Sequence, residues 1–174
     1  MRRFVKSYIS GLFSLALLLT LSAAVNADNL PRKEQLTDID LQWMQVKKRE
    51  VSDLASRHFG RFFNTDKAHN LRLIQDLLDS KIIARTDTEL LQGMGFIIGD
   101  LLAKEEGLRW IVYVDSRGRS RALEVPNKPD VVFLGTSIAR RYEVGAPVNV
   151  QQVYQKLQSA AQYIRSRFYV REMQ

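Results

Sequence analysis

The chain has 174 residues, of which 45% are hydrophobic and 26% are charged, and it contains no cysteine. Disulfides, cysteine-based metal sites and thiol nucleophiles are therefore excluded. The formal charge of +7 falls to +4 without the three basic residues among the first 27, and so small an excess is a poor argument for nucleic-acid binding.

Residues 1–27 have the three parts of a secretory signal peptide in the required order. Three basic residues precede an uncharged apolar run over 11–21, and Val25 and Ala27 supply the small side chains that signal peptidase needs. We expect cleavage between Ala27 and Asp28 and a periplasmic location in a Gram-negative type of envelope. A lipid anchor is not expected, because no cysteine lies at the cut. The alternative is an uncleaved anchor, but a spanning helix wants about 20 apolar residues.

The remainder is long enough for one domain with a substantial core. We expect residues 28–36 to be a linker and residues 37–170 to be a single domain. Helical spacing of apolar residues predicts a first helix over 37–62, capped by Thr37 or Asp38 and ended near Gly60. Its expected buried face is Ile39, Trp43, Val51, Leu54, His58 and Phe62.

A second helix is predicted to reach about Asp79, and a third to run from Thr86 to Gly107. Thr86 and Glu89 have the spacing of a capping box. The third helix is apolar over most of its circumference, which predicts that it lies at the centre of the domain. Its internal glycines, Gly93 and Gly99 among them, are explained by the close approach of another backbone, most simply the segment that follows.

After Gly107 the hydrophobic period changes from 3.6 to 2. Residues 109–115 and 121–125 flank a turn containing Gly118, which predicts a hairpin, and residues 131–134 are expected to form a third strand. A short helix is predicted around 137–142 and a long closing helix from a second capping box, Asn149 with Gln152. The predicted fold class is α+β, with several helices packed on a small three-stranded antiparallel sheet.

No assembled catalytic or cofactor motif is present. His58 and His69 lack partners at metal-ligand spacing, so we expect neither a metal site nor a cofactor. The glycines of residues 93–99 lie inside a helix rather than between a strand and a helix, where a phosphate loop requires them. Asp100 lies on the only face of its helix that is not plainly apolar. An ion pair with Lys104 explains it, and a functional acid lining a groove is the alternative.

A basic cluster surrounds the predicted hairpin, with Trp110 and Tyr113 close by in the sequence. Arginine and aromatic side chains are enriched in protein interfaces and in anion recognition. The alternative is a solvated turn with Trp110 in the core. The candidate binding residues are Asp100, Trp110, Asp115, Arg119, Arg140 and Arg141.

Residues 91–100, Gly107-Leu108-x-Trp110 and Asp115-x-x-Gly118-Arg119 together resemble a bacterial family, the domain of unknown function 3806. The resemblance covers about residues 90–157 and implies no reaction, cofactor or catalytic residues. Asp100 and Asp115 are the two recurring positions that packing does not easily explain.

Two functions from different classes follow. The first is a non-enzymatic periplasmic module that binds another envelope protein or an anionic ligand, with a protective inhibitor of an envelope toxin as a special case. The second is a small envelope hydrolase or lyase that uses Asp100 and a second carboxylate, which would have to share one cleft.

Overall fold

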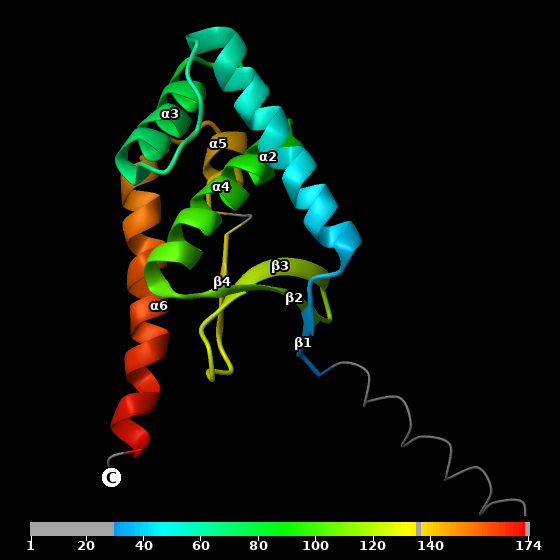
Figure 1. Ribbon diagram of the computed structural model, residues 1–174, viewed down its shortest axis with the longest axis vertical. Helices are drawn as coiled ribbons and strands as arrows, with labels where there is room; N and C mark the ends of the chain where they lie inside the picture. Colours follow the sequence, from blue (N-terminus) through cyan, green and yellow to red (C-terminus); the bar gives the residue numbers. More distant parts are fainter. Residues whose placement is uncertain (1–29, 135–136, 173–174) are drawn as a thin grey trace, which may run out of the picture.

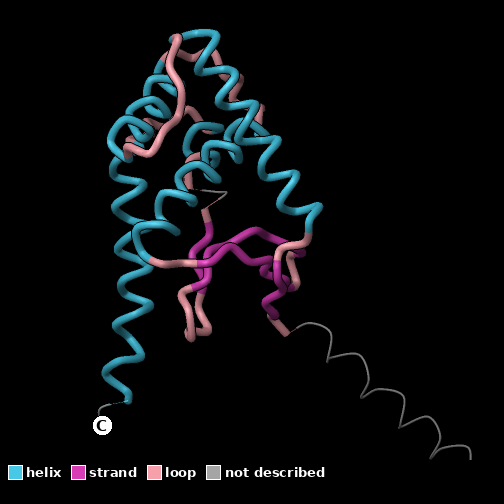
Figure 2. Tube along the Cα trace, viewed as in Figure 1, coloured by secondary structure: helices cyan, strands magenta, loops and turns pink. Residues whose placement is uncertain are grey.

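The longest helices of the molecule enclose a central one, and a small sheet closes one end of the bundle (Figures 1 and 2). This computed structural model describes residues 30–134 and 137–172, so the expected signal peptide and its cleavage point lie outside the described residues. The helices are α2 (Asp38–Phe59), α3 (Lys67–Asp79), α4 (Thr88–Glu106), α5 (Ala139–Glu143) and α6 (Val150–Glu172). The strands are β1 (Arg32–Gln35), β2 (Arg109–Asp115), β3 (Gly118–Glu124) and β4 (Val131–Phe133).

The sheet is antiparallel with strands in the order β1-β2-β3-β4, which confirms the α+β class but not the expected three strands. The fourth strand, β1, lies inside 28–36, the segment that we expected to be a linker. It pairs with β2 from Arg32 opposite Val114 to Gln35 opposite Ile111. A four-residue edge strand made of charged and amide side chains has no hydrophobic alternation, so periodicity did not reveal it.

Helix α2 begins with a capping box in which the Thr37 hydroxyl accepts from the Asp40 amide and the Asp40 carboxylate accepts from the Thr37 amide. Gly60 ends the helix in the left-handed conformation, with a φ of 62°. The predicted buried face was wrong at its ends, because Ile39 and Phe62 are 78% and 63% exposed and His58 is exposed as well. The buried residues of α2 are Asp40, Met44, Lys47, Val51 and Ala55, of which only Val51 belongs to the predicted face.

Helix α4 is the centre of the core, as its nearly continuous apolar surface predicts. The predicted capping box was wrong: Asp87 is the N-cap and its carboxylate accepts from the Leu90 amide at 3.1 Å. Aspartate is at least as good an N-cap as threonine, so the helix begins one residue later than Thr86 would allow. Glu89 turns away from the cap and forms an ion pair with Lys47 of α2.

Two glycines of α4 allow neighbouring elements to approach closely. A Cβ on Gly99 would lie 2.3 Å from the Trp110 ring of β2, so the following hairpin does approach there, through a side chain. A Cβ on Gly93 would lie 2.5 Å from the carbonyl oxygen of Lys47, so the backbone that approaches there belongs to α2 and not to the hairpin.

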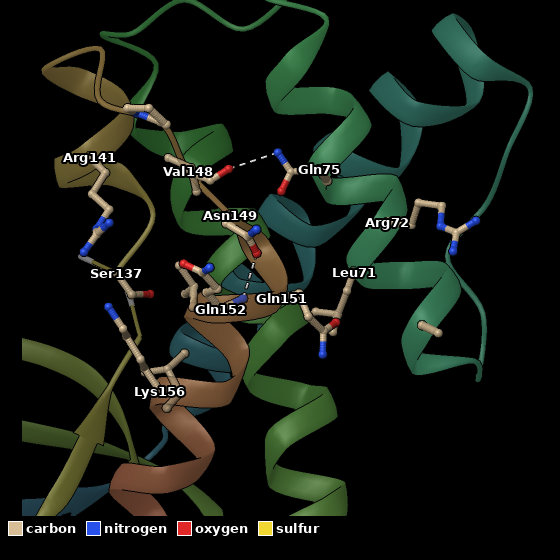
Figure 3. Close-up of a pocket in the computed structure, with 14 residues that line it drawn as sticks. Leu71, Arg72, Gln75, Ser137, Arg141, Val148, Asn149, Gln151, Gln152 and Lys156 are labelled. Carbon is tan, nitrogen blue, oxygen red and sulfur yellow. Dashed lines mark hydrogen bonds between the residues drawn. The ribbon is translucent and has the colours of Figure 1, made fainter.

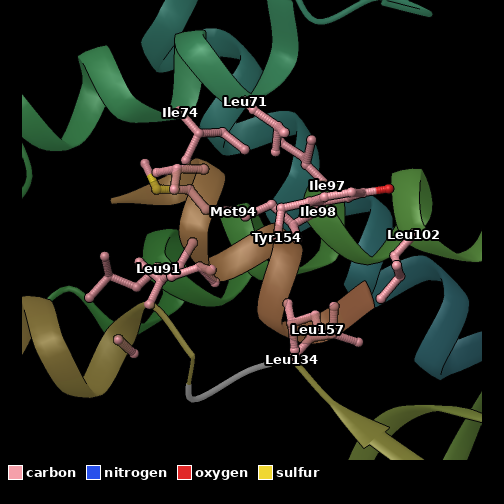
Figure 4. Close-up of a cluster of buried hydrophobic side chains, with 14 of the residues drawn as sticks. Leu71, Ile74, Leu91, Met94, Ile97, Ile98, Leu102, Leu134, Tyr154 and Leu157 are labelled. Carbon is pink, nitrogen blue, oxygen red and sulfur yellow. The ribbon is translucent and has the colours of Figure 1, made fainter. Parts of the chain in front are cut away.

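The core forms where α4 meets α3, α6 and the inner face of the sheet (Figure 4). Tyr154 and Leu157 of α6 pack against it, and Leu123 and Val132 contribute from the sheet. One of the two hydrogen bonds of the second predicted capping box is found: the Asn149 side chain accepts from the Gln152 amide at 2.9 Å. No helix in residues 30–134 and 137–172 is long and apolar enough to cross a membrane.

Candidate functional site

The β2–β3 hairpin carries a row of arginines toward α2. A two-residue turn, Ser116-Arg117, joins the strands, with Asp115 opposite Gly118. Alternate residues of a strand point to the same face, so Arg119 and Arg121 both project from the face of β3 that looks toward α2. Together with α2, α4 and α5 the hairpin forms a cleft of about 470 Å³, which we call the hairpin cleft. Its lining residues are Trp43, Gln92, Phe96, Asp115, Arg117, Arg119, Ser120, Arg121, Phe133 and Arg140.

Arg121 is the best-fixed side chain of the hairpin cleft. Its Nη2 donates to Asp40 Oδ1 at 2.7 Å, and its guanidinium lies 4.3 Å from the centre of the Trp43 ring. Its Nε atom is buried and has no hydrogen-bond partner in the described part of the chain. Burial opposes ionisation of Asp40, but hydrogen bonds from Thr37 and Arg121 outweigh it and lower the pKa of that carboxyl.

The other hairpin arginines also have carboxylate partners. Arg119 donates to Glu34 of β1 at 2.7 Å, and Arg117 donates to Asp115 at 2.8 Å. Hydrogen bonds from Arg117 hold the pKa of Asp115 below its ordinary value. Arg140, on α5, is exposed and forms none of the ion pairs found among the described residues. Three arginines of the cleft are therefore paired with carboxylates, whereas Arg140 is paired with none among the described residues.

Aromatic rings line the same cleft. Phe96 makes edge contacts with Trp43 at 5.4 Å and with Trp110 at 5.7 Å between ring centres. Phe133 makes a similar contact with Tyr113 at 5.3 Å and is 39% exposed. Rigid aromatic surfaces beside fixed guanidinium groups are typical of the centres of protein interfaces.

Beside the hairpin cleft, part of one edge of β3 has no neighbour among the described strands, and we call it the open edge. β4 pairs only with residues 122–124 of β3, so residues 118–121 have a ladder partner on the β2 side alone among the described strands. Ser120, in the middle of that open stretch, lines the cleft. An unpaired strand edge offers backbone donors and acceptors to another chain.

The predicted binding residues fall into separate places. Asp115, Arg119 and Arg140 come together in the hairpin cleft. Asp100 does not pair with Lys104: its carboxylate accepts from Lys48 Nζ at 2.6 Å and from the Trp110 indole at 2.8 Å. Trp110 is therefore a packing residue whose polar atom is satisfied by Asp100.

Sequence reasoning missed the part of the hairpin cleft that comes from α2. Trp43 was assigned to the buried face of that helix, and Asp40 was not singled out. The signal in the sequence was the Thr37-x-x-Asp40 spacing, which indicates a helix cap. That spacing does not indicate that Arg121 also binds the Asp40 carboxylate.

Arg141 lines a different cavity, beside the N-terminus of α6 (Figure 3). This α6 pocket has a volume of about 840 Å³ and lies between α3, α6 and the segments on either side of α5. The short helix α5 thus directs Arg140 into the hairpin cleft and Arg141 into the α6 pocket. Across the described ranges, no three histidine, aspartate or glutamate side chains are grouped closely enough to hold a metal ion.

A solved structure has a similar fold. A crystal structure of a protein from Bacteroides thetaiotaomicron VPI-5482 matches with a TM-score of 0.64 and 17% sequence identity. The match covers 72% of this chain and 46% of that chain, so this protein spans about half the length of its solved neighbour. At that identity the likeness concerns the fold alone.

No curated protein matches the sequence. A family model does: residues 70–154 match the model described as domain of unknown function (DUF3806), which confirms the resemblance drawn from the glycine, tryptophan and aspartate pattern. The matched segment begins in α3 and ends in α6, so it contains both arginines of α5 and the whole hairpin but not α2. Residues 70–154 of the chain are therefore similar to the DUF3806 family.

Proposed function

We propose that the protein is an exported, non-enzymatic interaction module of the bacterial envelope, and that its hairpin cleft binds an extended, acidic segment of another envelope protein. The observation that carries this proposal is the meeting of arginines, aromatic rings and an open strand edge in one cleft. Each of the three suits a protein partner, and none requires a reaction.

The open edge of β3 suits a partner strand. A peptide that continues the line of β4 would pair with residues 118–121, and its backbone would supply affinity while its side chains entered the cleft. Ser120 on this stretch of β3 and Phe133 at the end of β4 both line the cleft. Strand addition would also pair the part of β3 that the three-residue strand β4 leaves unpaired among the described strands.

The charge of the cleft favours an acidic partner. Four arginines and one aspartate line it, and Arg140 has no carboxylate partner in the described part of the chain. Complementary charge raises the rate of association and selects the partner. The ion pairs of Arg117 and Arg119 hold their side chains in place before a partner arrives, which reduces the entropy lost on binding.

Site-specific photo-crosslinking in living cells tests the proposal. A benzoylphenylalanine in place of Ser120 is on the stretch of β3 that borders the cleft. The same residue in place of Ser159, exposed on α6 and outside every pocket described above, is the matched control. We expect a discrete crosslinked product from position 120 only, and its loss when Arg140→Glu is added. Equal products from both positions, or no product from position 120, would count against the cleft.

Export is a separate part of the proposal. It rests on the signal-peptide pattern of residues 1–27, and intact mass of the protein recovered from periplasm tests it. A mature chain that begins at Asp28 is expected. Recovery of a chain that retains Met1 to Ala27 in the membrane fraction would make it an anchored protein instead.

The protective inhibitor is a special case of the same module, in which the partner is an envelope-attacking toxin. Its test is protection of cells by the wild type but not by Arg140→Glu. The alternative of a small hydrolase or lyase has less support, because Asp100 is shared between Lys48 and Trp110. Among the described residues that line the pocket beside Asp100 there is no second carboxylate.

A further inference from the structure

We infer that the α6 pocket is a second binding site, for a small amphipathic anion: a carboxylate or phosphate group attached to an apolar body. This site is separate from the hairpin cleft and shares none of its lining residues. Its volume of about 840 Å³ lies in the range of small-molecule sites, roughly 300 to 1,000 Å³.

The charges of the pocket are of one sign. Arg72, Arg141 and Lys156 line it, and no aspartate or glutamate does among the described residues. None of their three side chains takes part in an ion pair or hydrogen bond found in the described part of the chain. The hairpin cleft differs in this respect, because three of its four arginines have carboxylate partners. The positive charge of the α6 pocket is therefore available to a ligand.

The basic side chains are not equivalent. In Figure 3 the charged ends of Arg141 and Lys156 both point toward Ser137, whereas Arg72 lies on the opposite rim and points away. The Ser137 hydroxyl already donates to the Leu134 carbonyl at 2.7 Å, so it anchors the start of the α5 segment rather than the ligand. Arg141 and Lys156 are thus the two groups placed to hold one anion between them.

The backbone around the pocket is held in place by hydrogen bonds. The Gln75 side chain accepts from the Val150 amide at 2.9 Å and donates to the Val148 carbonyl at 3.0 Å. Asn149 caps the next amides of α6. These bonds fix α6 against α3, and the positive end of this 23-residue helix adds to the field that attracts an anion.

The part of the pocket wall away from the basic side chains is apolar. Ala68 of α3 and Pro147 and Val148 before α6 line it with apolar groups that are exposed or half-buried, and the core residues Leu71, Val153 and Leu157 lie along the same wall. A free inorganic ion would leave this surface in contact with water. An anionic group with an apolar body would satisfy Arg141 and Lys156 at one end and cover the apolar wall with the other.

Calorimetric titration of the purified protein with octanoate and octyl phosphate tests the assignment, with acetate, inorganic phosphate and the uncharged octyl glucoside as comparison ligands. We expect one saturable site for at least one octyl anion, tighter than for acetate, phosphate or octyl glucoside. Preference between the two octyl anions decides between a carboxylate and a phosphate headgroup. NMR shifts of the Gln75 and Gln152 side-chain amides would locate the ligand at this pocket.

Charge-neutral variants complete the test. Arg141→Gln and Lys156→Gln should each weaken binding by about tenfold, the effect of one charge-assisted hydrogen bond. Arg72→Gln removes the same charge from the opposite rim and should weaken binding by less than about threefold. Three outcomes would overturn the site: no saturation below about 10 mM, equal effects of all three variants, or binding that leaves the two glutamine amides unshifted. Thermal unfolding confirms that each variant is folded.

Discussion

Gly93 is the residue at which the packing of α2 on α4 is tightest. A Cβ there would lie 2.5 Å from the Lys47 carbonyl oxygen and 2.7 Å from the Val51 side chain. The carbonyl belongs to helical backbone and cannot turn aside as a flexible side chain would. We expect Gly93→Ala to lower the free energy of unfolding by about 1–2 kcal/mol, because overpacking outweighs the better helix propensity of alanine.

Urea denaturation measures that change, and Ser159→Ala on the exposed face of α6 is the control. The control should stay within about 0.5 kcal/mol of the wild type. A Gly93→Ala variant more stable than the wild type would mean that α2 moves away without cost, and the close contact would then have no role in holding the two helices together.

Asp100 illustrates what sequence can and cannot reveal about a single residue. Its helical face was identified correctly as the least apolar one, and Lys104 was the partner that spacing offered. The actual partners, Lys48 and Trp110, lie 52 and 10 positions away on α2 and β2. Helical periodicity predicts only contacts between residues of the same helix, so it could not identify a partner on another element.

At the scale of the element, the sequence has two candidate N-cap residues for α4, Thr86 and Asp87, and the structure shows that Asp87 is the N-cap. The Asp87 side chain accepts from the Leu90 amide, whereas Thr86 accepts from Thr88 only through its backbone carbonyl. We expect Asp87→Ala to cost about 0.5–2 kcal/mol of stability, because the orphan amide loses its acceptor. Thr86→Ala should change it by less than about 0.5 kcal/mol.

Thermal or urea unfolding of the two alanine variants, compared side by side, checks this assignment. The two residues are adjacent, so differences in general helix propensity or exposure are small between them. A larger loss for Thr86→Ala than for Asp87→Ala would mean that the helix begins at the predicted capping box after all.

The elements that the sequence revealed are those with strong periodicity. The central position of α4 and the β2–β3 hairpin both follow from apolar spacing and from Gly107 and Gly118. β1 escaped because it is a polar edge strand that exists only through its pairing with β2. Only part of the hairpin cleft was predicted. Arg117, Arg119 and Arg121 are close together in the sequence and were recognised as a basic cluster, whereas Trp43 reaches the cleft from the distant helix α2.

At the scale of the whole molecule, α6 is joined to the end of α4 through two neighbouring carboxylates, Glu105 and Glu106, of which Glu106 has the less exposed side chain. Glu106 accepts from the side-chain amides of Gln158 and Gln162, each at 2.9 Å, and from Arg165 at 2.9 Å. These three donors lie on one face of α6. The Glu106 side chain is only 7% exposed, so this contact is shielded from solvent better than most of the surface ion pairs.

This carboxylate makes stability depend on pH in a definite direction. Burial opposes its ionisation, but the hydrogen bonds from Gln158, Arg165 and Gln162 outweigh burial and lower the pKa of Glu106 below its ordinary 4.5. The unfolded chain therefore binds a proton more readily than the folded one, so the stabilisation is complete above about pH 4.5 and is lost as the pH falls through the folded value. The pKa values of Asp40 and Glu124 are lowered as well, so the wild type should lose stability steadily in acid.

We expect Glu106→Gln to lower the Tm at pH 7, because the charge that Arg165 pairs with is removed, and to reduce the fall in Tm between pH 6 and pH 3.5. Glu143→Gln is the matched control, since Glu143 is exposed at the end of α5 and has no ion pair among the described residues. Thermal unfolding followed by circular dichroism across that range measures both variants. If the pH dependence of Glu106→Gln equals that of the wild type, protonation of Glu106 is not what releases α6 from α4.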